Sequence, residues 1–166
     1  AASNNAPVAA NDTGTVNEDA TLSVSDGASS NSVASTTHDS SPLDVSSQEN
    51  QPRGLTFSHD GTKMFVCGDS GNDINEYTLS TAYDVSTASF VDSLSVSSKE
   101  TSPMSVQFNN DGTKMFVTGT SSDAVHEYTL TTGYDVSTAS FESSLDISSQ
   151  DLNPFGLAFN NDGTKM

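Results

Sequence analysis

The chain repeats itself with a period of 51 residues. The string FSHDGTKMFVCG at 57–68 returns as FNNDGTKMFVTG at 108–119 and begins again as FNNDGTKM at 159–166. Segments 52–102 and 103–153 are identical at 28 of 51 positions. A repeat of about 40–50 residues is typical of a stacked array or a propeller, in which each unit buries its apolar faces against its neighbours. This period constrains the fold more than any other feature.

The repeat also sets the boundaries of the units, which we call blades. Two complete blades occupy 52–102 and 103–153. Segment 36–51 matches the end of a blade and is expected to be the last strand of a preceding one, whereas 154–166 matches the start of a further, truncated blade. Segment 1–35 lies outside the repeat. Because the chain lacks an initiator Met and stops inside the recurring motif, we expect it to be a piece of a longer protein.

Each blade is predicted to contain four short strands, which in the first blade span 54–58, 63–68, 74–79 and 90–96. The second is a continuous apolar run, which suits a strand covered on both faces. In the third and fourth strands apolar and polar residues alternate. We therefore expect the third strand to be half-buried with Glu76 on its exposed side, and the fourth to carry Phe90, Leu94 and Val96 on one face. The dipeptide Asp60-Gly61 favours a hairpin turn. The predicted fold class is all-β, with four-stranded antiparallel blades that form an open fragment of a β-propeller.

The motif DGTKMFV at 60–66, followed by a variable loop and an EYTL strand at 76–79, resembles the bacterial β-propeller repeats of the YVTN and lactonase-like type. The resemblance covers roughly 42–166. It implies a propeller fold, and it implies no particular reaction, because this architecture serves enzymes, adhesins and scaffolds alike.

A second resemblance lies at the start of the chain. The string NNAPVAANDTGTVNEDATLSV at 4–24 is similar to the opening of the cadherin-like or VCBS-type modules of large bacterial surface proteins. It covers two strands, at 14–16 and 21–24, whereas a complete module of that kind needs about 100 residues. We therefore expect either a polar linker with two transient strands or a strand pair that docks on the first blade or on a preceding module.

Charge and hydropathy exclude several classes of partner. The formal net charge is −17, with 22 acidic residues against 5 basic ones. Such a chain repels phosphate, so neither nucleic acid nor an anionic membrane surface is an expected partner. No apolar run approaches the 18 or so residues of a membrane span, and no membrane insertion is expected. Cys67 is the only cysteine and cannot form an internal disulfide.

One loop of the first blade is rich in oxygen ligands, which suggests calcium. Its candidate ligands are Asp69, Asn72, Asp73 and Asn75. The repeat places Thr120, Asp123, Ala124 and His126 at the equivalent positions. Because the set is not retained and fits neither the EF-hand pattern nor the nonapeptide of calcium-binding β-rolls, we predict no metal site and regard a solvated acidic loop as the simpler interpretation. Asp60, Asp111 and Asp162 do recur, but each precedes Gly and is explained by turn formation.

The three histidines, His38, His59 and His126, fall at non-equivalent positions of the repeat. His59 aligns with Asn110 and His126 with Asn75, so both are predicted to be exposed polar residues with no catalytic or metal-binding role. No nucleophile elbow, phosphate loop or separate carboxylate pair is present, so we predict no catalytic residue and no cofactor.

Two further residues depart from the repeat. Arg53, the only Arg, stands at the head of an inner strand where its counterparts are Met104 and Phe155. It is predicted to be either a surface cation or a channel-lining group that contacts an anionic or glycan ligand. Cys67 aligns with Thr118 and is expected to be a small, partly buried hydrophobe. The sequon Asn11-Asp12-Thr13 matters only if the source glycosylates asparagine.

The sequence therefore predicts a non-enzymatic, extracellular or cell-surface repeat module with a structural, adhesive or ligand-binding role. Its expected partners are a protein or glycan ligand, further blades of the parent chain, or a second copy of itself. The alternative is a lactonase-like propeller enzyme whose central-channel site lies outside this segment. An enzyme would need unique polar residues from several blades aimed at one point.

Overall fold

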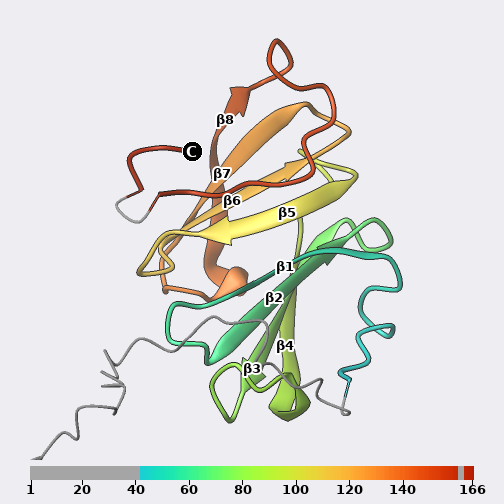
Figure 1. Ribbon diagram of the computed structural model, residues 1–166, viewed down its shortest axis with the longest axis vertical. Helices are drawn as coiled ribbons and strands as arrows, with labels where there is room; N and C mark the ends of the chain where they lie inside the picture. The colour runs from blue at the N-terminus through green and yellow to red at the C-terminus, as the bar shows by residue number, and fades with distance from the viewer. Residues whose placement is uncertain (1–41, 161–162) are drawn as a thin grey trace, which may run out of the picture. The chain divides into compact units, whose positions relative to one another are not determined.

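The computed structural model describes residues 42–160 and 163–166 (Figure 1). The predictions for 1–35 and 36–41 lie outside these residues. The same holds for His38, for Asp162 and for the sequon at Asn11.

The described residues form two four-stranded antiparallel sheets, and the predicted all-β fold, an open fragment of a propeller, is confirmed (Figure 1). The strand order is β1-β2-β3-β4 in one sheet and β5-β6-β7-β8 in the other. The strands are β1 (Pro52–Phe57), β2 (Lys63–Gly68), β3 (Asp73–Leu79), β4 (Ala88–Ser95), β5 (Pro103–Phe108), β6 (Lys114–Gly119), β7 (Ala124–Leu130) and β8 (Ala139–Asp146).

One turn of 3-10 helix precedes the outer strand of each blade, namely η2 (Val85–Thr87) and η3 (Val136–Thr138). In the described part of the chain no helix has the length and apolarity needed to cross a membrane.

The β1–β2 turn forms because its residues suit it. Gly61 has φ +70° and donates its N–H to the Ser58 carbonyl at 2.9 Å, a conformation that costs glycine little. The Asp60 carboxylate accepts hydrogen bonds from the Thr62 N–H at 3.0 Å and the Ser58 hydroxyl at 2.7 Å. These donors lower the pKa of Asp60 to about 2, and the Thr62 N–H has the largest effect. The same turn recurs at Gly112, so the predicted role of the Asp-Gly dipeptide is confirmed.

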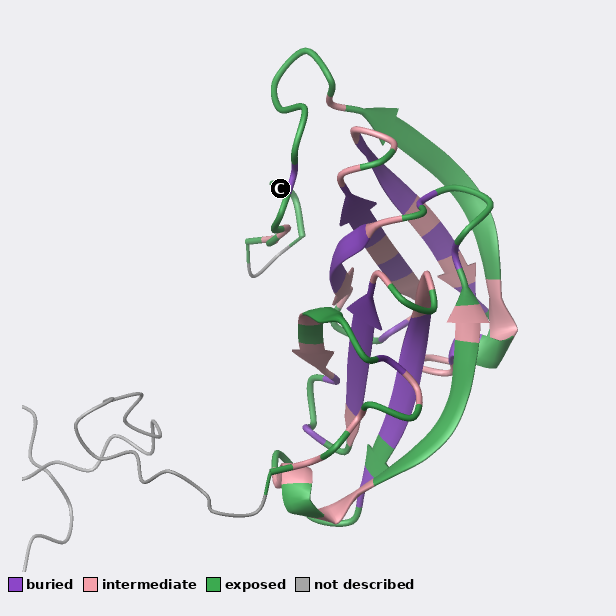
Figure 2. Ribbon diagram, turned by 90° about the vertical axis from the view of Figure 1, so that its right-hand side faces the viewer, coloured by how far each residue is buried: buried purple, intermediate pink, exposed green. Residues whose placement is uncertain are grey.

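Burial increases from the outer strand to the central strands of each sheet (Figure 2). In β2 the four residues from Met64 to Cys67 are all buried, as a strand covered on both faces requires. By contrast, β4 and β8 are almost wholly exposed. The prediction for β3 was wrong in one respect, because the Glu76 side chain is buried. The second blade covers that face of β3.

The predicted alternation along β4 is also interrupted. Tyr77 of β3 pairs with Phe90, but the adjacent Glu76 pairs with Asp92, so Val91 is an extra residue in β4. Such a bulge shifts the alternation of side chains by one position. As a result Phe90 is 45% exposed, whereas Val96 is fully buried just beyond the strand.

A single apolar core joins the two sheets. The first blade contributes Phe65, Cys67 and Ile74, all fully buried. Strand β5 lies against β1 and β2, and the Phe65 and Phe108 rings are 4.3 Å apart. The second blade and the segment before it contribute Val96, Val106, Met115, Val117, Tyr128, Leu130 and Val136. The core therefore lies mostly between the blades.

The segments that flank the two blades form no strands among the described residues. In 42–51, the described part of the segment predicted to hold the last strand of a preceding blade, the chain turns at 46–48, as it does at 97–99 and 148–150 after β4 and β8. Leu43 and Val45 still pack on the first blade. The start of the further blade forms its turn, with Gly163 donating to the Asn160 carbonyl at 3.0 Å, but no strand.

We expect Phe65→Ala to destabilise the two blades by about 3–5 kcal/mol, because it opens a cavity in the core between them. Phe90→Ala is the matched control, since Phe90 is an exposed Phe whose ring contacts Tyr77 at 5.7 Å, and it should cost about 1 kcal/mol or less. Thermal or denaturant unfolding of both variants measures the difference. Equal losses would contradict a core shared between the blades.

Candidate functional site

The oxygen-rich loop of the first blade does not gather its four candidate ligands around one point. Asp69 pairs with Arg53 at 2.7 Å and accepts from the Ser102 hydroxyl, also at 2.7 Å. Asp73 instead accepts a hydrogen bond from the Asn75 amide at 2.7 Å, and Asn72 has a left-handed backbone with φ 50°. Among the described residues no group of three or more His, Cys, Asp or Glu side chains is placed to hold a metal ion.

Arg53 lies at the start of β1, as predicted, and its charge is matched locally. Both Nε and Nη2 donate to Oδ2 of Asp69, at 2.9 and 2.7 Å. The hydrogen bond from the Ser102 hydroxyl, and to a smaller extent Arg53, keeps the pKa of Asp69 below its usual value. Cys67 is more deeply buried than predicted, and burial raises the pKa of its thiol to about 12. Its thiol is therefore protonated and unreactive at neutral pH.

Two fully buried glutamates, which the sequence predictions missed, anchor the loop before each blade. Glu49 accepts backbone N–H bonds from Gln51, Ser70 and Gly71 at 2.6 to 3.2 Å. Glu100 occupies the same position 51 residues later and accepts from the N–H groups of Ser102, Ser121 and Ser122. The signal was present in the repeat, since an acidic residue recurs at 49, 100 and 151.

Glu100 also begins a polar network unique to the second blade. Its carboxylate accepts from the Ser122 hydroxyl at 2.6 Å, and that hydroxyl lies 2.8 Å from Nε2 of His126. The other ring nitrogen, Nδ1, lies 2.8 Å from the hydroxyl of Ser144 on β8. His126 is only 4% exposed, so the prediction that it is an exposed polar residue was wrong. The hydroxyls of Ser122 and Ser144 give both ring nitrogens a partner, so a buried His can stand where the first blade has Asn75.

The order of groups in this network argues against nucleophilic catalysis. Burial raises the pKa of Glu100, but the Ser121 and Ser122 donors outweigh this effect and leave it below the usual value, so the carboxylate is ionised and can only accept hydrogen bonds. The Ser122 proton therefore points to Glu100, and His126 must donate to Ser122 through Nε2. A base that would activate Ser122 needs the opposite arrangement. The network instead links the β6–β7 hairpin to β7 and β8.

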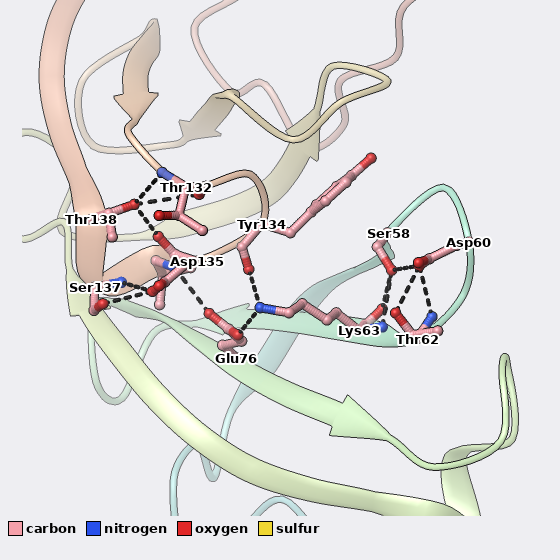
Figure 3. Close-up of polar contacts among 11 residues, drawn as sticks. Ser58, Asp60, Thr62, Lys63, Glu76, Thr132, Tyr134, Asp135, Ser137 and Thr138 are labelled. Carbon is pink, nitrogen blue, oxygen red and sulfur yellow. Dashed lines mark hydrogen bonds and ion pairs between the residues drawn. The ribbon is translucent and has the colours of Figure 1, made fainter.

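A group of polar contacts between the blades surrounds Glu76. Lys63 reaches from β2 to the Glu76 carboxylate at 2.6 Å and to the Tyr134 carbonyl of the second blade at 2.8 Å (Figure 3). The other Glu76 oxygen accepts the Val136 N–H at 2.9 Å. We call these four residues, Lys63, Glu76, Tyr134 and Val136, the inter-blade clasp. Its carboxylate satisfies an N–H group at the start of η3, which has no partner within that short helix.

The loop of the second blade is shaped for this contact. Asp135 caps η3 by accepting from the Ser137 N–H at 3.1 Å, and Tyr134 adopts φ 59°. The Tyr134 ring covers Gly112, where any Cβ would lie 2.3 Å from the ring, and its hydroxyl accepts the His59 N–H at 3.2 Å. Glycine at 112 is thus required by both its φ and its close neighbour.

The second blade carries the same pair, Lys114 and Glu127, but among the described residues no loop of a further blade docks on it. Lys114 forms an ion pair with Glu127, but the two side chains are 45% and 26% exposed, against 26% and 2% for Lys63 and Glu76. A cleft of about 380 Å³ lies beside Lys114, and Phe116, Phe159 and the adjacent turns complete its lining. Another cleft, of about 310 Å³, lies on the first blade between Val45, Leu55 and Val85.

Comparison with known proteins supports the fold. No protein-family model matches the chain, and no curated protein sequence matches it. A candidate 6-phosphogluconolactonase from Bacteroides fragilis has a similar structure, with a TM-score of 0.52 and 12% identity over 68% of this chain and 30% of that one. Another, from Bacteroides uniformis, gives 0.50 and 9% over 68% and 31%. The chain thus spans less than a third of these lactonase-like propeller proteins, and it shares their fold.

We expect Glu76→Gln to cost about 2–3 kcal/mol of stability, because it leaves Lys63 without its counter-ion between the blades. Glu127→Gln is the matched control at the equivalent position, and it should stay within about 1 kcal/mol because that pair is solvated. Urea unfolding of the two variants provides the measurement. If Glu127→Gln were as damaging as Glu76→Gln, the clasp would not hold the blades together.

Burial, and secondarily the nearby Lys99, lowers the pKa of His126, although the Glu100 charge acts in the opposite direction. The unfolded state therefore binds the proton more readily than the folded state does. The stability that neutral His126 contributes is present above its ordinary pKa of 6.5 and is lost as the pH falls below that value. Between pH 7.5 and 5.5 we expect the melting temperature to fall less in His126→Asn than in the parent chain. His59→Asn, at an exposed position, should follow the parent. Identical slopes in all three would contradict a buried neutral His126.

Proposed function

We propose that this chain is a non-enzymatic repeat module with a structural or adhesive role at the cell surface or outside the cell. The observation that carries the proposal is how its distinctive polar residues are used. Arg53 pairs with Asp69, and His126 lies between two serine hydroxyls. Glu76 joins the two blades. These groups, which an enzyme would aim at a substrate, are engaged in holding the protein together.

Charge and sequence support the location and the partners. A net charge of −17 keeps the molecule soluble and repels anionic surfaces, so its ligands would be neutral or cationic proteins or glycans. The similarity of 4–24 to modules of bacterial surface proteins supports an extracellular location. Blades that share one sequence pattern present similar outer surfaces repeatedly, which suits a spacer or an adhesive array better than a single catalytic centre.

The second candidate is a lactonase-like enzyme. It is favoured by the structural similarity to the two candidate 6-phosphogluconolactonases, which are propellers more than three times as long as the matched region. In that case the catalytic groups would come from several blades at the inner strand ends. Arg53, at the start of β1, is the described residue best placed to take part.

Incubation of the 166-residue chain with a panel of sugar lactones, including a phosphorylated one, tests whether the described blades, Arg53 included, take part in hydrolysis. We expect hydrolysis no faster than in buffer. Arg53→Gln is prepared in parallel, with Lys99→Gln as a control of equal charge change. The enzyme candidate would be the better account if turnover rose with protein concentration and fell only in Arg53→Gln while its melting temperature stayed unchanged.

A further inference from the structure

The interface between the blades is built from two different surfaces. The first blade presents what we call a back face, made of Phe65, Cys67 and Ile74 together with Lys63 and Glu76. The second blade presents what we call a front face, made of Val106, Met115, Val117 and Val136 together with the carbonyl of Tyr134. Each blade should carry both faces, because the two blades share one sequence pattern.

The front face of the first blade is only partly covered. Leu43 and Val45 pack on it, and its Met64 and Val66 are buried. Leu55, the counterpart of Val106, is 53% exposed, whereas Val106 is 1% exposed. The cleft of about 310 Å³ lies over this face, with Leu55, Met64, Val66 and Val85 in its lining. Large exposed apolar surfaces on a soluble chain mark sites of association.

The loop that belongs to this front face is already in its docking conformation. Tyr83 has φ 61° and Asp84 caps η2 through the Ser86 N–H, as Tyr134 and Asp135 do in the second blade. The Tyr83 ring covers Gly61 just as Tyr134 covers Gly112. The first blade therefore displays a copy of the very element that the Glu76 carboxylate binds in the interface between the blades.

The back face of the second blade is only partly covered. Phe159 packs on Phe116 with the rings 4.6 Å apart, which repeats the contact of Phe108 with Phe65. Nothing among the described residues takes the place that Tyr134 and Val136 hold on the first blade, and the cleft of about 380 Å³ lies there. Lys114, the counterpart of Lys63, lines the cleft, and it pairs with Glu127, the counterpart of Glu76.

We propose that the front face of one molecule docks on the back face of a second copy, replacing its segment 154–166. Leu55 and Val85 would then be buried as Val106 and Val136 are, and the Val85 N–H would meet the Glu127 carboxylate as the Val136 N–H meets Glu76. The docking is head-to-tail and heterologous, so it forms a ring if the rotation closes.

Analytical ultracentrifugation of the 166-residue chain over a concentration series tests this association. We expect the average mass to rise with concentration. Leu55→Glu should weaken association about tenfold or more, because it places a charge in the apolar contact. Val91→Glu is the matched control, because Val91 is 51% exposed on the outer strand β4 and belongs to neither face. This variant should associate like the parent chain. A monomer at every concentration, or equal association of Leu55→Glu and the parent, would overturn the proposal.

Mixing two defective variants tests the head-to-tail geometry. Leu55→Glu spoils only the front face and Glu127→Lys only the back face, so each alone should be monomeric while their mixture forms a dimer and stops there. Glu127→Ala replaces Glu127→Lys if the latter melts early. A mixture that stays monomeric would exclude the heterologous interface.

A third variant distinguishes docking from non-specific aggregation. Phe159→Ala loosens the segment that competes for the back face, so it should associate more tightly than the parent although it is less apolar. Weaker association of Phe159→Ala would contradict the proposed competition.

Discussion

A four-stranded blade cannot bury both of its faces by itself, and the rest of this structure depends on that constraint. The central strands are apolar on both sides, so Phe65 and Cys67 require a neighbour as much as Met64 and Val66 do. The second blade is the neighbour for one side, and Leu43 and Val45 give partial cover to the other. The core between the blades is consequently the main source of stability, and the outer strands contribute little burial.

Polar groups then fix how the blades meet. An apolar face alone tolerates sliding, whereas the Glu76 carboxylate must meet both Lys63 and the Val136 N–H. Glu49 and Glu100 perform a related task within each blade by holding the entering chain against the β2–β3 or β6–β7 hairpin. The acidic residues that matter structurally are thus the buried ones, and this use of charged groups favours a scaffold over a catalyst.

The repeat and the alternation of apolar residues were enough to predict the strands, the Asp-Gly turns and the doubly covered β2. They were insufficient wherever a residue's surroundings come from segments that are not adjacent to it in the sequence. Glu76 and His126 have polar neighbours in sequence and were predicted to be exposed, yet contacts from distant segments bury both. Glu49 and Glu100 bind backbone N–H groups about 20 residues away, and no local pattern encodes such a contact. The bulge at Val91 likewise follows from strand pairing.

Hydrogen exchange of two equivalent amides, measured at low protein concentration, tests most directly whether the Glu76 contact unites the blades. The Val136 N–H donates to Glu76, whereas Val85, its counterpart 51 residues earlier, has no side-chain acceptor for its N–H in the described part of the chain. We expect the Val136 amide to exchange about a hundredfold more slowly and only with global unfolding. Equal exchange at the two sites would show that the blades open independently and would contradict the account.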